Sequence, residues 1–243
     1  PEVEVVDLAR HPGPGPSGHP LLSGPLHRAL ERCLSAGEQA ILFLNRRGFA
    51  PSLRCGACAG LLRCPACSVS LTEHRRAGLL RCHYCDFAMQ VSEACPSCGA
   101  LALERVGVGT ERIEDALSAS FPGARVGRLD RDTAAGQGVE AVLERMRTRQ
   151  LDLLVGTQMV AKGHDLPGVT LVGVLLADQS LAFPDFRASE RTFQLLARVA
   201  GRAGRGELPG RVVLQTYQPQ HFAVRHALTH DYLGFYRAEI GER

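Results

Sequence analysis

Eight of the nine cysteines in this 243-residue chain lie between residues 55 and 98, as four C-x-x-C pairs. The pairs are Cys55/Cys58, Cys64/Cys67, Cys82/Cys85 and Cys95/Cys98. A C-x-x-C pair presents two thiolates from one tight turn, which is the ligand spacing of structural zinc sites. The sequence therefore predicts a metal-held module within a longer chain, with two Zn²⁺ ions bound by four thiolates each.

The distances between the pairs favour one grouping of the eight ligands. The pairs are separated by 5, 14 and 9 residues. A gap of 14 is close to zinc-ribbon spacing, whereas five residues are few to enclose one ion. We therefore expect a nested arrangement of an outer site and an inner site. The outer site is Cys55, Cys58, Cys95 and Cys98, and the inner site is Cys64, Cys67, Cys82 and Cys85.

Other uses of the cysteines are less consistent with the sequence. The opening PEVEVVDLAR lacks the basic start of a secretory signal, and no apolar run is long enough to cross a bilayer. We expect a soluble, cytoplasmic protein, in which thiols stay reduced and disulfides are rare. Iron–sulfur clusters use other spacings, and a redox-active C-x-x-C pair is normally single. His74 and His83 lie beside the pairs and remain alternative ligands.

The rest of the chain alternates between strand-like and helix-like segments, which predicts an α/β fold with a mostly parallel sheet. Expected strands are 3–8, 40–44, 125–130, 151–156, 170–177 and 211–217. Expected helices are 21–36, ended by Gly37, 110–121, begun by an N-cap at Thr110, 138–149, 188–201 and 220–240. The expected domains are 1–53 and 100–219 as one lobe, 54–99 as the zinc module, and 220–243 as a helix leading to a further domain.

Composition says little about partners. The formal net charge is +3, and the charge of two four-thiolate zinc sites would make it slightly negative. The chain has no tryptophan and only 5% aromatic residues. Binding of nucleic acid by many aromatic stacking platforms is therefore not expected, and any basic contacts must be local.

Several segments together resemble one known family. They are ILFLNRRGFAP, the four cysteine pairs, VGTQMVAKGHDLPGVTLVGVLLAD, PDFRASERTFQLL and VAGRAGR. In this order, and over nearly the whole chain, they resemble the primosomal protein N′ (PriA) family of superfamily-2 replication-restart DNA helicases. The resemblance implies that the chain is the second RecA-like helicase lobe, with the cysteine-rich module inserted.

The resemblance also assigns candidate DNA-binding residues. It implies that Arg46 and Arg47 of helicase motif IV, with Gly156, Thr157 and Lys162 of motif V, lie near the DNA backbone. A Gly-Thr turn after a strand offers amide and hydroxyl donors that suit phosphate oxygens.

Motif VI implies that Arg202 and Arg205 act as arginine fingers on ATP and Mg²⁺ held with another lobe. The chain has no G-x-x-x-x-G-K-[ST] sequence, so no catalysis by this segment alone is expected. Arg198 stands where the family's motif VI has glutamine, and the glutamine links ATP state to lobe closure. We therefore expect the motor of the parent protein to be weakened or lost.

The expected function is binding of forked or single-stranded DNA and of primosome partners during replication restart. Implied partners are single-stranded-DNA-binding protein, primosome loading factors and the replicative helicase, without a membrane, and the chain is expected to be a monomer. One alternative is a lobe of an active ATP-dependent 3′→5′ DNA helicase. Another is a zinc-ribbon scaffold without ATP function.

Overall fold

The computed structural model shows two compact units, and each is described by itself. Residues 1–47, 109–178 and 189–243 form the first unit, and residues 48–108 with 179–188 form the second. The structure describes residues 2–11, 19, 21–44, 52–58, 60–67, 70–74, 78–82, 85–106, 110–136, 138–157, 159–160, 165–182, 185–201, 203 and 209–242.

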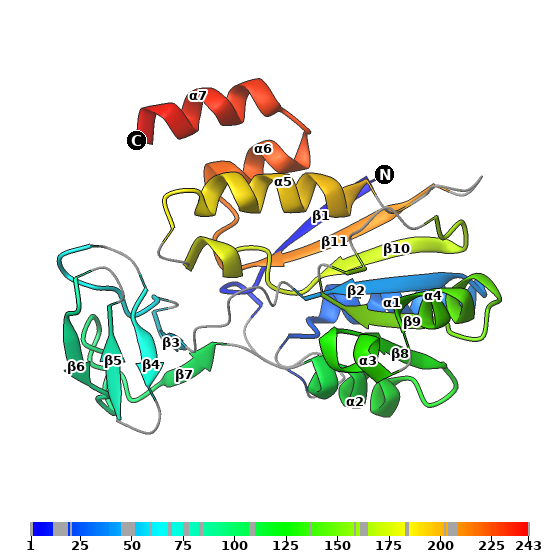
Figure 1. The fold of residues 1–243 in the computed structure, drawn as a ribbon, viewed down its shortest axis with the longest axis horizontal. Coiled ribbons are helices and arrows are strands. Elements are labelled where there is room, and N and C mark those ends of the chain that lie inside the picture. The colour runs from blue at the N-terminus through cyan, green and yellow to red at the C-terminus, as the bar shows by residue number, and fades with distance from the viewer. Residues whose placement is uncertain are drawn as a thin grey trace. The chain divides into compact units, whose positions relative to one another are not determined.

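The first unit is built on a six-stranded sheet (Figure 1). In spatial order the strands are β1 (Glu2–Asp7), β11 (Arg211–Thr216), β10 (Val169–Val174), β2 (Gln39–Phe43), β9 (Leu153–Gly156) and β8 (Val126–Leu129). Every neighbouring pair is parallel. Every residue of β2, β9 and β10 is buried, as expected for parallel strands covered on both faces. The predicted α/β fold with a mostly parallel sheet is confirmed.

The helices of the described residues are α1 (Gly24–Ser35), α2 (Thr110–Ser120), α3 (Arg131–Gly136), α4 (Val139–Arg147), α5 (Ala188–Ala200), α6 (Phe222–Leu228) and α7 (Tyr232–Glu242), and a short 3₁₀ helix covers Gln179–Ala182. Helices α1 to α5 lie between strands in the sequence, α6 and α7 follow the last strand, and residues 179–188 belong to the second unit. Helix α1 ends where Gly37 adopts a φ of 71°, and the Glu38 amide donates to the Cys33 carbonyl at 3.0 Å. This left-handed closure confirms Gly37 as the residue that ends the helix.

None of the helices in the described part of the chain combines the length and apolar character needed to span a membrane.

Two local predictions were wrong. Thr110 is the first residue of α2 rather than its N-cap, and its hydroxyl donates to the Asp130 carboxylate at 2.6 Å. The helix expected over 220–240 is two helices, because His230 has a φ of 53° and α7 begins anew at Tyr232, directly after Asp231. The Asp231 carboxylate accepts from the Gly234 amide at 2.8 Å, which is the hydrogen bond of a helix N-cap.

The second unit contains short antiparallel strands. Strand β3 (Ser52–Cys55) pairs with β7 (Leu103–Val106), and β4 (Thr72–His74), β5 (Leu79–Arg81) and β6 (Ala88–Gln90) form a separate three-stranded sheet. A small apolar cluster forms the core of this second unit and consists of Leu53, Leu62, Leu71 and Leu80 with Cys64 and Cys82. This core is small beside that of the first unit, so metal ligands have a large part in holding the module.

Candidate metal centres and sheet-edge site

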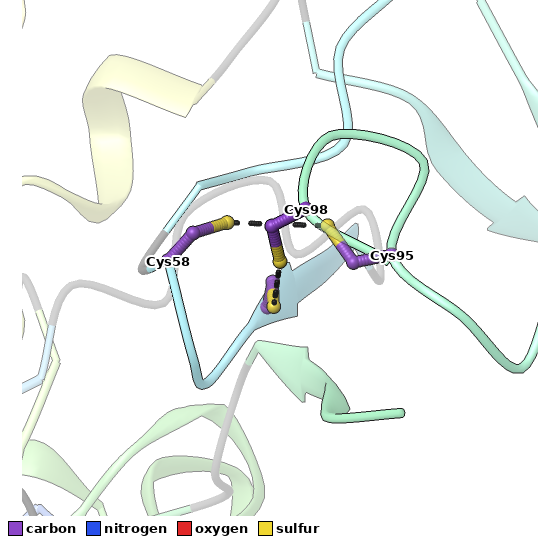
Figure 2. A group of neighbouring side chains, drawn as sticks. Cys58, Cys95 and Cys98 are labelled. Atoms are coloured by element: carbon purple, nitrogen blue, oxygen red, sulfur yellow. Dashed lines mark hydrogen bonds between the residues drawn. The ribbon is translucent and has the colours of Figure 1, made fainter. Parts of the chain in front are cut away.

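The outer cysteines converge from both ends of the module (Figure 2). Cys55 is the last residue of β3, and Cys58 follows in a turn. Cys95 and Cys98 belong to a second turn, after which Gly99 has a φ of 73°. The Sγ atoms of Cys55 and Cys98 are 3.6 Å apart, and those of Cys58 and Cys95 are 3.9 Å apart.

Of the inner cysteines, Cys64 and Cys82 belong to the apolar cluster and Cys67 packs against it. Cys82 directly follows β5, and its amide donates to the Phe87 carbonyl at 2.8 Å, which closes the turn that carries Cys85. The Sγ atoms of Cys64 and Cys85 are 3.5 Å apart. All four Sγ atoms of the inner group, with Cys67 as the fourth, lie within 4.8 Å of one another, as do the four of the outer group.

These separations suit tetrahedral zinc. Zn–S bonds of about 2.3 Å in a tetrahedron place the sulfur atoms ~3.8 Å apart, close to the 3.5, 3.6 and 3.9 Å observed. The structure thus brings the eight cysteines into the nested groups expected from their spacing. His74 belongs to neither group, and His83 lies outside the described residues. Four sulfur ligands complete each shell, so the sites have a structural rather than a water-activating donor set.

Cys95 of the outer group and Cys67 of the inner group have thiol pKa values displaced in opposite directions from the ordinary value. The Ser97 amide, and after it the Cys98 amide, donates to Cys95 and lowers the pKa of its thiol to about 6. A hydrogen bond with Cys85, reinforced by burial, raises the pKa of Cys67 to about 12. Four crowded thiolates repel one another, and a divalent cation at the centre offsets that repulsion. The residues present therefore fit two zinc ions.

A second candidate site lies at the carboxyl end of β9. Gly156 is the last residue of the strand, and a Cβ atom there would lie 2.9 Å from the Leu129 carbonyl oxygen and would overlap Val160. Glycine is therefore required for this close packing. The Thr157 amide donates to the Leu129 carbonyl at 3.3 Å. This amide is therefore engaged within the sheet, whereas the Thr157 hydroxyl has no partner among the described residues.

The other residues expected to contact DNA or ATP stay predictions. Arg46, Arg47, Lys162, Arg202 and Arg205 lie outside the described residues. Arg198 is exposed on α5.

Asp130 was not among the residues predicted for this edge of the sheet. Its carboxylate lies fully buried just beyond the end of β8. Besides the Thr110 hydroxyl, it accepts the Thr133 amide at 3.0 Å. It thereby ties the first residue of α2 and the first turn of α3 to the strand next to β9. An acid directly after a buried strand was the available signal, because α/β sheets place functional groups at that edge.

Comparison with known proteins identifies the same module. The family model described as "PriA DNA helicase Cys-rich region (CRR) domain" matches residues 64–89. Replication restart protein PriA of Bacillus subtilis (strain 168) is 45% identical over 244 residues, which cover 100% of this chain and 30% of that protein. The PriA of Treponema pallidum (strain Nichols) is 43% identical over 243 residues, covering 100% of this chain and 36% of that protein.

Among solved structures, the C-terminal domain of the DEAD-box protein Dbp5 aligns with a TM-score of 0.41 at 14% identity, covering 84% of this chain and 76% of that chain. The chain spans about a third of the length of the curated relatives it matches. The similarity to those relatives extends over the whole of the chain, and the family's cysteine-rich region matches at the inner cysteines. The chain belongs to the PriA family.

Proposed function

We propose that this segment serves replication restart by binding forked or single-stranded DNA at the carboxyl edge of its parallel sheet. The observation that carries the proposal is the Thr157 hydroxyl, which follows β9 and has no partner among the described residues. Gly156 keeps the strand end compact beside it. A hydroxyl at the end of a parallel strand is suited to a phosphate oxygen, which positions nucleic acid without reading its sequence.

Matched substitutions at Thr157 test this proposal. Thr157→Val removes the hydroxyl and keeps the side-chain shape, whereas Thr157→Ser keeps the hydroxyl. We expect Thr157→Val to weaken binding of a fluorescent forked DNA about 3- to 10-fold, the loss of roughly one hydrogen bond, and Thr157→Ser to bind nearly normally. The loss should be the same for unrelated DNA sequences. Equal binding by the valine variant and the unaltered chain would remove Thr157 from the interface.

We further propose that the zinc module contacts primosome partners, including single-stranded-DNA-binding protein. The two cysteine groups of the described residues each offer four sulfur ligands, which leaves no position for an activated water and suits binding rather than catalysis. Surface-immobilised zinc-loaded chain should retain single-stranded-DNA-binding protein, and chelation of the metal should abolish retention. Retention that survives complete zinc removal would place the contact on the first unit.

The proposed weakening of the motor rests on Arg198. This exposed side chain on α5 stands where the family motif has glutamine. In the full-length parent, Arg198→Gln should increase ATP hydrolysis in the presence of forked DNA. Arg145→Gln, which changes an exposed arginine of α4, should not. Robust turnover by the unaltered parent would overturn the proposal.

An active ATP-dependent DNA helicase is the second candidate. The matching family model is described as that of a DNA helicase, and the relatives extend well beyond the matched segment. The ATPase measurement on the parent separates the two candidates. The third candidate is a zinc-ribbon scaffold. It predicts that this chain binds no DNA and that the full-length parent protein binds no ATP.

A further inference from the structure

The two predicted zinc sites have different surroundings. In the inner site Cys64 and Cys82 are 2% and 0% exposed and belong to the apolar cluster with Leu53, Leu62, Leu71 and Leu80. None of the four outer cysteines belongs to that cluster. In the outer site Cys58 and Cys98 are both exposed, whereas in the inner site Cys85 is exposed and Cys67 is half-buried. Solvent therefore reaches more of the outer site.

The polypeptide around the outer site has supports that do not involve metal. Cys55 pairs with Leu103 in the β3–β7 ladder, and Arg54 forms an ion pair with Glu104 at 2.9 Å. Both outer turns are also closed by backbone hydrogen bonds. The Cys55 amide donates to the Gly60 carbonyl, and the Cys95 amide donates to the Ala100 carbonyl, each at 2.9 Å. Loss of the outer ion alone should therefore leave the module folded around the inner ion.

We propose that the outer site is an oxidative modification site, in which peroxide converts Cys98 and Cys55 into a disulfide and releases the outer zinc ion. Cys98 is the exposed member of the pair, Cys55 is fully buried, and their Sγ atoms are 3.6 Å apart. As zinc ligands both sulfurs are thiolates, and an exposed thiolate with a second thiolate beside it is the arrangement in which oxidation ends reversibly at a disulfide.

The chemistry has two steps. The Cys98 thiolate attacks one oxygen of hydrogen peroxide, the O–O bond breaks, and sulfenic acid and hydroxide form. The Cys55 thiolate then attacks the Cys98 sulfur, an S–S bond forms, and a second hydroxide leaves. The two sulfurs together lose two electrons, which reduce the peroxide. Cys58 and Cys95 remain reduced, and these two thiolates alone would hold a zinc ion too weakly to retain it.

The proposal predicts stepwise metal release. The zinc-loaded full chain is treated with limiting hydrogen peroxide, and free zinc is followed with a chromophoric chelator. We expect one equivalent of zinc to be released in a fast phase and the second to remain bound. Non-reducing peptide mapping should find a Cys55–Cys98 link, and dithiothreitol with added zinc should restore two bound ions.

Two matched variants assign the effect to Cys98. Cys98→His replaces the oxidisable thiolate with another zinc ligand, since Cys₃His sites also bind zinc. It should retain two zinc ions and slow the fast phase about tenfold. Cys85→His makes the same change at the exposed cysteine of the inner site and should leave the fast phase unchanged. Each variant's zinc content before oxidation shows that its site has formed.

Simultaneous loss of both ions, earlier loss of the inner ion, or a first disulfide between other cysteines would overturn the proposal. So would a Cys98→His variant that releases zinc as fast as the unaltered chain. These readouts do not involve DNA, so their failure is distinguishable from failure of the proposed DNA interface.

Discussion

The two units of this chain are stabilised in different ways. The first unit buries whole strands in its core. Leu42, Val172 and Leu154, on three adjacent strands, are each 0% exposed. The second unit has strands of only three or four residues, and its apolar cluster includes two of its own metal ligands. Hydrophobic burial grows with the number of residues that share a core, whereas a metal ion can stabilise a segment too small to form one. The comparison therefore separates stability that depends on packing from stability that depends on zinc.

Removing both metal ions should give the largest effect, and only in the second unit. Structural zinc sites contribute roughly 10–16 kcal/mol each, far more than the small apolar cluster can replace. Hydrogen exchange after chelation should show loss of protection in β3 to β7 while β2, β9 and β10 remain protected. Equal loss in both units would mean that the sheet also depends on zinc.

A cavity in the sheet should produce the reverse pattern. Leu42→Ala removes a fully buried side chain from β2 and should lower the free energy of unfolding of the first unit by about 2–5 kcal/mol. Bound zinc should remain at two ions per chain by metal analysis. Leu233→Ala, at an exposed position on α7, is the matched control and should change urea unfolding little. Zinc loss in the Leu42→Ala variant would contradict the independence of the units.

The N-cap of α1 should have a smaller effect. The Ser23 hydroxyl accepts from the Leu26 amide at 3.4 Å and is buried. Ser23→Ala should destabilise the first unit by about 1 kcal/mol, seen as a lower urea midpoint, whereas Ser23→Thr should preserve much of the cap. An alanine variant as stable as the unaltered chain would show that the long hydrogen bond contributes nothing measurable.

The smallest expected effect is that of pH on the sheet unit. Hydrogen bonds from the Arg125 side chain lower the pKa of Asp152 below its ordinary value of 3.8. A lowered carboxyl pKa stabilises the folded state above pH 3.8, and that contribution is lost as the pH falls below it. Asp152→Asn should cost about 0.5–1 kcal/mol at pH 7 and less at pH 2. Urea unfolding of the first unit at both pH values would check this, and a cost independent of pH would assign the effect to packing.

The parts that could be predicted from sequence depend on local patterns. Continuous apolar runs identified the buried strands, and the spacing of the cysteine pairs was enough to predict two nested groups. The left-handed turn at Gly37 was also readable, because glycine adopts that conformation without a Cβ penalty.

The parts that could not be predicted depend on partners distant in sequence or on competing backbone contacts. Thr110 was misjudged because its hydroxyl bonds to Asp130, 20 residues away. The Thr157 amide likewise has a partner 28 residues away, the Leu129 carbonyl of the adjacent strand, which the sequence pattern did not indicate. At His230 a non-glycine residue adopts a φ of 53°, and the helical pattern gave no sign of that break.

The antiparallel pairing of β3 with β7 has a consequence for how the chain folds. Strand β2 must find β9 across the whole cysteine-rich segment, and the entropy of closing a loop rises with its length. Once β3 and β7 have joined, the ends of that segment are already adjacent, and the loop between the sheet strands is effectively shortened by the residues between them. Zinc supply during synthesis should therefore influence how quickly the parallel sheet assembles, although no metal ligand belongs to the sheet.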